Sequence, residues 1–134
     1  MAHTNRGRVI LGGLLAGVVI NIVEFVTNGV APTGAIVMFN VWGFLLGIAA
    51  VWLYAAIRPR YGSGPNTAIR AGLVAWALAV FLPNLSNYPL GLFPTRLLVI
   101  STVVALIELP LATVVGAWSY KEEREAPAVL RPAA

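Results

Sequence analysis

Four long apolar blocks, separated by short segments rich in proline, glycine and arginine, dominate the pattern of this chain. They cover residues 9–30, 36–57, 67–82 and 97–119. Three of these blocks are about as long as the ~20 residues that a helix needs to cross ~30 Å of hydrocarbon, and the third is the shortest. Because a proline kinks or stops a helix, we expect the third helix to end near Pro83 and a loop to run from Asn84 to Thr95. The pattern predicts an all-α fold, an integral membrane four-helix bundle over residues 9–120. A short leader (residues 1–8) precedes it, and a disordered tail (residues 121–134) follows.

The composition agrees with a membrane location. Hydrophobic residues make up 59% of the chain and charged residues 10%, whereas soluble domains carry roughly 25% charged residues. Cysteine is absent and the single histidine is His3 in the leader, so the spans contain neither a thiolate nor an imidazole to bind a transition metal or haem. We therefore expect no metal centre and no cofactor.

The basic residues indicate how the spans are oriented. Those expected on one side are Arg6, Arg8, Arg58, Arg60, Arg70, Lys121, Arg124 and Arg131. Only Arg96 belongs to the other side, and such a bias in short loops predicts that both termini face the cytoplasm. Because topology places these charges, the net charge of +4 does not indicate a nucleic-acid partner.

Two glutamates stand alone inside apolar blocks. Glu24 lies in the first and Glu108 in the fourth, and an ionisable group at hydrocarbon depth is costly unless it is paired, hydrated or neutralised. Together with nearby amides they make up the predicted intramembrane polar cluster: Glu24, Glu108, Asn21, Asn28 and Asn40. The alternative is ion pairing, with Arg96 as the partner of Glu24 and Arg70 as the partner of Glu108.

Three roles remain open for these glutamates. A satisfied polar cluster would fix the register of the helices. A pair of exchangeable carboxyls would move protons or cations. A third possibility is contact with another subunit or a lipid headgroup.

Small residues share one face of each predicted helix. Lipid gives helices no hydrophobic reason to associate, so glycines that let backbones approach closely are typical of a bundle interface. The predicted packing positions are Gly13, Gly17, Gly43, Gly47, Gly72 and Gly116. In the basic loop after the second block, Arg58 and Arg60 are predicted to contact anionic lipid headgroups.

No catalytic set is present in the sequence. The blocks contain no histidine or cysteine and the only lysine is Lys121, so neither a nucleophile with its base nor a Ser–Lys pair can be assembled within them. We expect a protein that is not an enzyme.

Several stretches resemble a group of small bacterial four-transmembrane-helix proteins of uncharacterised function. They are Gly12–Gly17, Asn21–Phe25, Val51–Arg60, Gly91–Pro94 and Gly116–Glu123. The resemblance implies the architecture but no activity. A weaker likeness, in the number of spans, Glu24 and Trp76, is to small multidrug-resistance transporters, in which an embedded glutamate exchanges protons for a cationic drug. Glu108 departs from that pattern.

The sequence therefore favours an accessory or assembly subunit of a larger membrane complex, or a homo-oligomer. A bundle of four helices buries its glutamates and asparagines only shallowly, and a partner would complete their burial. The expected partners are membrane lipids and other membrane subunits or further copies of the chain. The alternative is a proton-coupled transporter of a small molecule or ion that uses Glu24 and Glu108.

Overall fold

The computed structural model describes residues 4–28 and 33–120, apart from the side chains of residues 27, 28 and 33. Its elements are α1 (Arg6–Asn28), α2 (Thr33–Tyr61), α3 (Pro65–Trp76), η1 (Ala77–Phe81), α4 (Leu82–Asn87), η2 (Tyr88–Leu90) and α5 (Thr95–Ser119). Every regular element in these ranges is helical, which confirms the all-α prediction. The predicted disordered tail, 121–134, lies outside the described residues.

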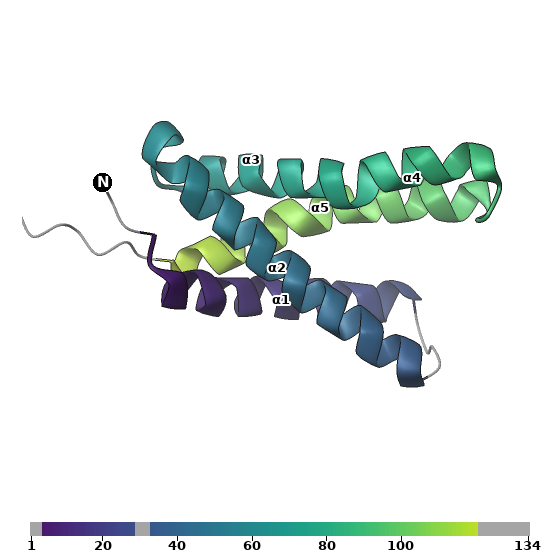
Figure 1. The fold of residues 1–134 in the computed structure, drawn as a ribbon, viewed down its shortest axis with the longest axis horizontal. Coiled ribbons are helices and arrows are strands. Elements are labelled where there is room, and N and C mark those ends of the chain that lie inside the picture. The colour runs from purple at the N-terminus through teal and green to yellow at the C-terminus, as the bar shows by residue number, and fades with distance from the viewer. Residues whose placement is uncertain (1–3, 29–32, 121–134) are drawn as a thin grey trace, which may run out of the picture.

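Within the described ranges, four helical segments are long and apolar enough to cross a membrane. They are Arg6–Val26, Gly34–Tyr61, Pro65–Leu90 and Thr95–Ser119. Successive segments run in opposite directions, so α1 begins, α2 ends, α3 begins and α5 ends at the same end of the molecule (Figure 1). This arginine end carries Arg6, Arg8, Arg58, Arg60 and Arg70.

The third segment is longer than its sequence pattern predicted. We expected it to stop near residue 82 because of Pro83, but helical structure continues to Leu90. The turn before the proline widens into the π-helix η1, in which the Leu82 N–H donates to Ala77 O. Since Pro83 has no N–H and its ring crowds the preceding turn, a local widening lets the chain stay helical. The predicted loop from residue 84 to 95 is therefore wrong over its first half.

The other helices also extend beyond their apolar blocks. Helix α1 starts at Arg6 and α2 runs from Thr33 to Tyr61, because charged and polar residues at a helix end project into a polar region while the backbone stays helical. Pro59 lies within the last turn of α2 and Pro110 inside α5. The end predicted for the first helix, residue 30, lies outside the described residues.

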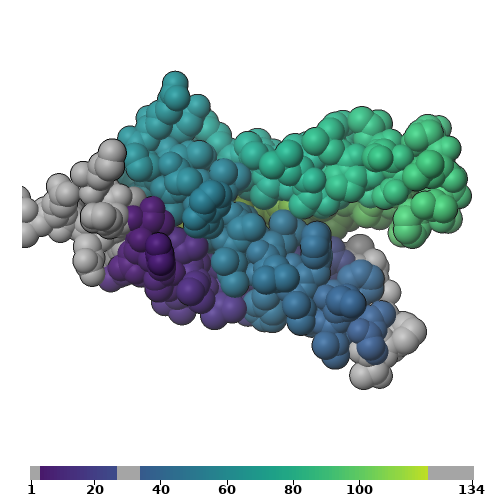
Figure 2. Space-filling model, in the orientation of Figure 1, coloured from purple at the N-terminus to yellow at the C-terminus, as the bar shows by residue number. Residues whose placement is uncertain are grey.

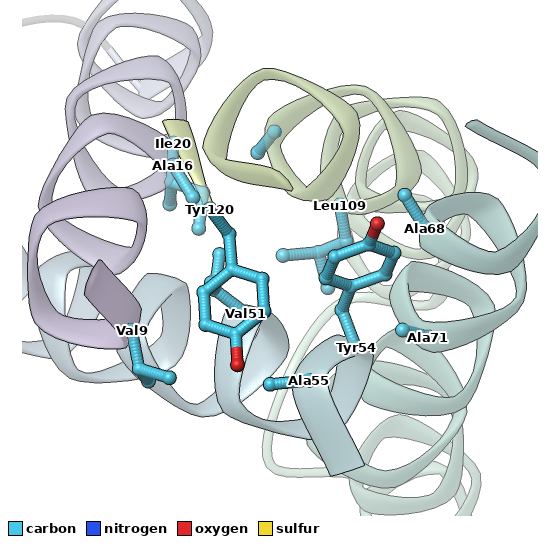
Figure 3. Packing of buried hydrophobic residues seen from close by; sticks show 11 residues of the cluster. Val9, Ala16, Ile20, Val51, Tyr54, Ala55, Ala68, Ala71, Leu109 and Tyr120 are labelled. Carbon is cyan, nitrogen blue, oxygen red and sulfur yellow. The ribbon is translucent and has the colours of Figure 1, made fainter. Parts of the chain in front are cut away.

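The main hydrophobic cluster lies toward the arginine end and is shown in Figure 3. Val51 and Leu109 are among its largest fully buried side chains. Two buried tyrosines pack there, with the ring centres of Tyr54 and Tyr120 6.0 Å apart and their planes at 89°, the edge-to-face geometry that aromatic pairs prefer. These tyrosines tie α2 to the residue that follows α5.

Glycines set the distances between the helices. A Cβ on Gly47 would lie 2.5 Å from Gly13 O, and a Cβ on Gly116 would lie 2.5 Å from Gly12 O. On the other side of α5, a Cβ on Gly72 would lie 2.5 Å from Pro110 Cα. At the remaining predicted packing positions an added Cβ would overlap Ile48 at Gly13 and Phe44 at Gly17, and at Gly43 it would meet the Asn21 side chain at 2.9 Å. Backbones therefore touch where α1 meets α2, where α1 meets α5 and where α3 meets α5.

The helices diverge away from these contacts. Helix α2 crosses α1 obliquely (Figure 1). The space-filling view in Figure 2 shows the first part of α2 separating from α4 toward the end at which α2 begins. Oblique crossing at a glycine contact brings two helices close at one point and leaves grooves on either side of it. The candidate site lies in these spaces between the helices.

Candidate functional site

The side chains of Glu24 and Glu108 line the same cavity, of about 150 Å³. Its walls come from α1, α2, η1 and α5, and we call it the glutamate cavity. The remaining lining residues are Ile20, Phe39, Trp42, Gly43, Leu46, Val80, Ala105 and Leu109. The two acids are more than 80 positions apart in the sequence and meet only because α1 packs against α5.

The two carboxyls stand against otherwise apolar walls. Glu108 is only 4% exposed, and its Oε1 accepts no hydrogen bond from the described residues. An unsatisfied polar atom in such surroundings costs roughly 1–3 kcal/mol, and more if it is charged. The cavity volume of about 150 Å³ far exceeds the ~15 Å³ that one water requires. The cavity therefore has room for a ligand beside the carboxyls.

A second, more open groove of about 430 Å³ adjoins this cavity. It lies between α1 and α2, and we call it the amide groove because Asn21 and Asn40 line it. Glu24 and Phe39 line both spaces. The Asn21 side-chain amide donates to Gly17 O at 2.8 Å and to Asn40 O at 3.3 Å, which holds that amide at the helix crossing.

The structure divides the predicted polar cluster between these two spaces. Glu24 and Glu108 share the glutamate cavity, whereas Asn21 and Asn40 line only the amide groove. The Asn40 side-chain amide donates to Ile36 O at 2.7 Å, one turn earlier in its own helix. The side chain of Asn28 lies outside the described residues.

The arginines proposed as ion-pair partners lie elsewhere. The guanidinium carbon of Arg70 is 5.2 Å from the centre of the Tyr61 ring, a cation–π contact at the arginine end. Arg96 is exposed at the start of α5, at the opposite end of the molecule. Among the described residues, no arginine lines the glutamate cavity.

The two arginines predicted to contact lipid headgroups differ from each other. The guanidinium carbon of Arg58 is 5.6 Å from the centre of the Tyr120 ring, and the side chain is partly buried. Arg60 is exposed. Arg58 thus joins α2 to the end of α5, and only Arg60 projects freely to the surroundings at that loop.

Sequence reasoning missed a polar contact centred on Asn84. The side-chain amide of Asn84 lies 3.0 Å from Ser101 Oγ and 2.8 Å from Thr102 Oγ1, and within 3.4 Å of Leu98 O. The nearby indole of Trp76 donates to Thr102 O at 2.9 Å. Assigning Asn84 to a loop hid this contact. A helix continued past Pro83 would have placed it opposite α5.

The glutamate cavity presents two carboxyls, aromatic rings and aliphatic side chains. Among the described residues, no group of three or more His, Cys, Asp or Glu side chains comes together. Carboxyls and aromatic faces both attract cations. The arrangement can therefore hold protons or a small cation at the carboxyls and apolar groups against the walls.

Comparison with known proteins finds no match. No protein-family model, no curated protein and no solved structure is similar to this chain. Any functional assignment therefore rests on the geometry of the glutamate cavity.

Proposed function

We propose that this protein is an integral membrane carrier that exchanges protons for a small cationic molecule at Glu24 and Glu108. Its four apolar helices span a bacterial inner membrane, and both termini lie in the cytoplasm. The arginine end supports this orientation, since Arg6, Arg8, Arg58, Arg60 and Arg70 gather there and positive residues concentrate on the cytoplasmic side.

The observation that carries the proposal is the meeting of the two glutamates in one cavity. A polar cluster that served only to fix helix register would satisfy its members with hydrogen bonds. Glu108 Oε1 has no such partner among the described residues. A buried carboxyl left unsatisfied is costly, and exchange of a proton or a ligand explains why it is retained.

The exchange follows from electrostatics. When both carboxyls are protonated the cavity is neutral. Loss of the protons places two negative charges around one small apolar space, where they repel each other strongly. A bound cation relieves this repulsion, so protons and the cation compete for the same oxygens. Competition of this kind couples the movement of one to the movement of the other.

The amide groove offers a route to the cavity. It shares Glu24 and Phe39 with the glutamate cavity and is open along one side of the α1–α2 pair. Phe25 and Phe44 add further apolar surface to its walls. An amphiphilic cation would enter with its apolar part against these rings and its charge toward Glu24.

The accessory-subunit role stays a prediction. It was motivated by the small-residue faces and by the shallow burial expected for the glutamates and asparagines. Those faces are occupied by helices of the same chain, as the contacts of Gly47 with α1 and of Gly72 with α5 illustrate. They therefore give no separate support for docking on another protein.

Transport assays in liposomes test the proposal. With an acidic lumen and a neutral exterior, the wild type should accumulate ethidium, a cationic dye. Glu24→Gln and Glu108→Gln should each abolish accumulation while expression and oligomeric state stay unchanged. Arg96→Gln, at an exposed position outside the cavity, is the control. Undiminished transport in both glutamine variants would refute the exchange mechanism. If these variants instead lose a protein that copurifies with the wild type, the accessory role would be favoured.

A further inference from the structure

A second groove between α1 and α2 lies at the arginine end, on the other side of their crossing from the amide groove. Its volume is about 420 Å³. The lining residues are Thr4, Arg6, Val9, Ile10, Ile48 and Trp52. None of them lines the glutamate cavity or the amide groove, so this interfacial groove is a separate feature.

The groove follows from the way in which the two helices cross. Gly47 meets Gly13 and Gly17 at the point of closest approach, and α2 runs obliquely over α1 (Figure 1). The helices separate on both sides of that point. One side holds the amide groove, and the other holds the interfacial groove.

Its floor is apolar and its mouth is cationic. Val9 is buried, whereas Ile10 and Trp52 are 51% and 57% exposed and form the sides. The exposed Arg6 stands at the mouth, as the first residue of α1. A tryptophan at the edge of a membrane-spanning helix is typical of the headgroup region.

The charge at the mouth has no local partner in the described part of the chain. The described acids are Glu24 and Glu108, and Glu24 lies about 27 Å along α1 from Arg6 at 1.5 Å per residue. The first turn of α1 contains no acidic residue. A positive charge at the start of a helix interacts unfavourably with the helix dipole, whereas the negative charge of a phosphate at the same place interacts favourably with it.

We propose that the interfacial groove binds an anionic phospholipid. Its phosphate contacts the Arg6 guanidinium and the Thr4 hydroxyl, and one acyl chain lies between Ile10 and Trp52 over Val9. A soluble anion would leave the apolar floor exposed, whereas a lipid covers it. The absence of a nearby acid among the described residues favours an anionic headgroup over a zwitterionic one. This inference requires membrane insertion but not the exchange mechanism.

Native mass spectrometry of detergent-solubilised protein tests the charge at the mouth. The protein is titrated with dioleoyl-phosphatidylglycerol and, separately, with dioleoyl-phosphatidylcholine. Arg6→Gln should weaken binding of the first lipid about five-fold and binding of the second by a smaller factor, because the choline cation offsets the charge of its phosphate. Arg60→Gln, which removes an exposed arginine at the same end, should change neither more than two-fold. If Arg6→Gln and Arg60→Gln weaken binding of the anionic lipid equally, the interaction is diffuse attraction to this end of the molecule and the proposal is overturned.

Filling the groove tests the acyl-chain contact. Ile10→Trp should weaken binding of both lipids, whereas Leu11→Trp is the matched control because Leu11 is equally exposed but does not line the groove. Both positions are exposed, so the folded state should tolerate the larger ring. If Ile10→Trp is not monodisperse, Ile10→Phe replaces it. Identical lipid binding by the groove-filling variant and its control would show that no chain lies there.

Discussion

At the scale of single residues, Glu108 is the clearest departure from what a stable core requires. Its carboxyl is 4% exposed, and Oε1 has no hydrogen-bond partner among the described residues. Thr113, one turn and a half further along α5, is equally buried, but its hydroxyl donates to Leu109 O at 2.6 Å. The Thr113 hydroxyl is satisfied by its own helix, whereas Glu108 Oε1 is not, and the proposed exchange gives this oxygen a proton or a ligand.

Glu108→Leu should therefore stabilise the protein while it abolishes transport. Replacing an unsatisfied buried carboxyl with a hydrocarbon side chain removes a penalty of roughly 1–3 kcal/mol, so the midpoint of thermal unfolding in mild detergent should rise. Thr113→Val removes a hydroxyl that is already satisfied, so it should leave the unfolding midpoint unchanged or lower it. A lower midpoint for Glu108→Leu would mean that this carboxyl stabilises the fold.

Asn84 is the polar residue with the opposite role. Its amide reaches Ser101 and Thr102 across the contact with α5, and Asn84→Ala should cost roughly 1–2 kcal/mol because those contacts are lost. Asn87→Ala is the control, because Asn87 lies on the same helix and its side chain makes no hydrogen bond to the described residues. Equal unfolding midpoints for the two variants would contradict a stabilising role for Asn84.

At the scale of elements, glycine contacts decide how closely the helices pack. Gly47 has backbone atoms of α1 within 2.5 Å of the position of a Cβ, whereas Gly34, also in α2, has no atom of the described residues within 4 Å. The first glycine is required by the packing, and the second is not. The amide groove and the interfacial groove both exist because of the contact at Gly47.

Gly47→Ala should destabilise the α1–α2 pair by roughly 1–3 kcal/mol, since the added methyl overlaps the α1 backbone. Gly34→Ala should be neutral or slightly stabilising, because alanine favours a helix over glycine. Thermal unfolding in detergent measures both. Similar midpoints for the two variants would show that α1 and α2 do not pack as described.

Much of the element structure could be predicted from the apolar blocks, and the exceptions have identifiable causes. The blocks located all four long helices, because hydrocarbon length sets the length of the apolar pattern. They missed the extension to Leu90, because a widened turn before Pro83 keeps the chain helical. They also left the meeting of Glu24 with Glu108 open, because packing between α1 and α5 decides which faces meet.

At the scale of the whole molecule, the distribution of arginines matches the alternation of the helices. Of the six arginines in the described ranges, five share one end, and Arg96 lies at the start of α5 at the other. The loop between α2 and α3 should therefore face the cytoplasm, and the loop between η2 and α5 should face outward. The chain has no native cysteine, which makes this orientation directly accessible to labelling.

Ser63→Cys and Leu92→Cys report on the two loops. In intact cells a membrane-impermeant maleimide should label the second variant and not the first, and both should react after the membrane is permeabilised. The arginine bias is the physical reason for this result. Labelling of Ser63→Cys alone in intact cells would reverse the orientation, and the interfacial groove would then lie at the outer surface.

The central claim is that protons and a cation compete for the carboxyls of Glu24 and Glu108. Calorimetric titration with tetraphenylphosphonium, in buffers of different ionisation enthalpy, counts the protons released on binding. We predict release of about one proton per cation bound, tighter binding as the pH rises, and loss of the release when both glutamates are changed to glutamine. Binding without proton release, or release unaltered by the double substitution, would contradict the account.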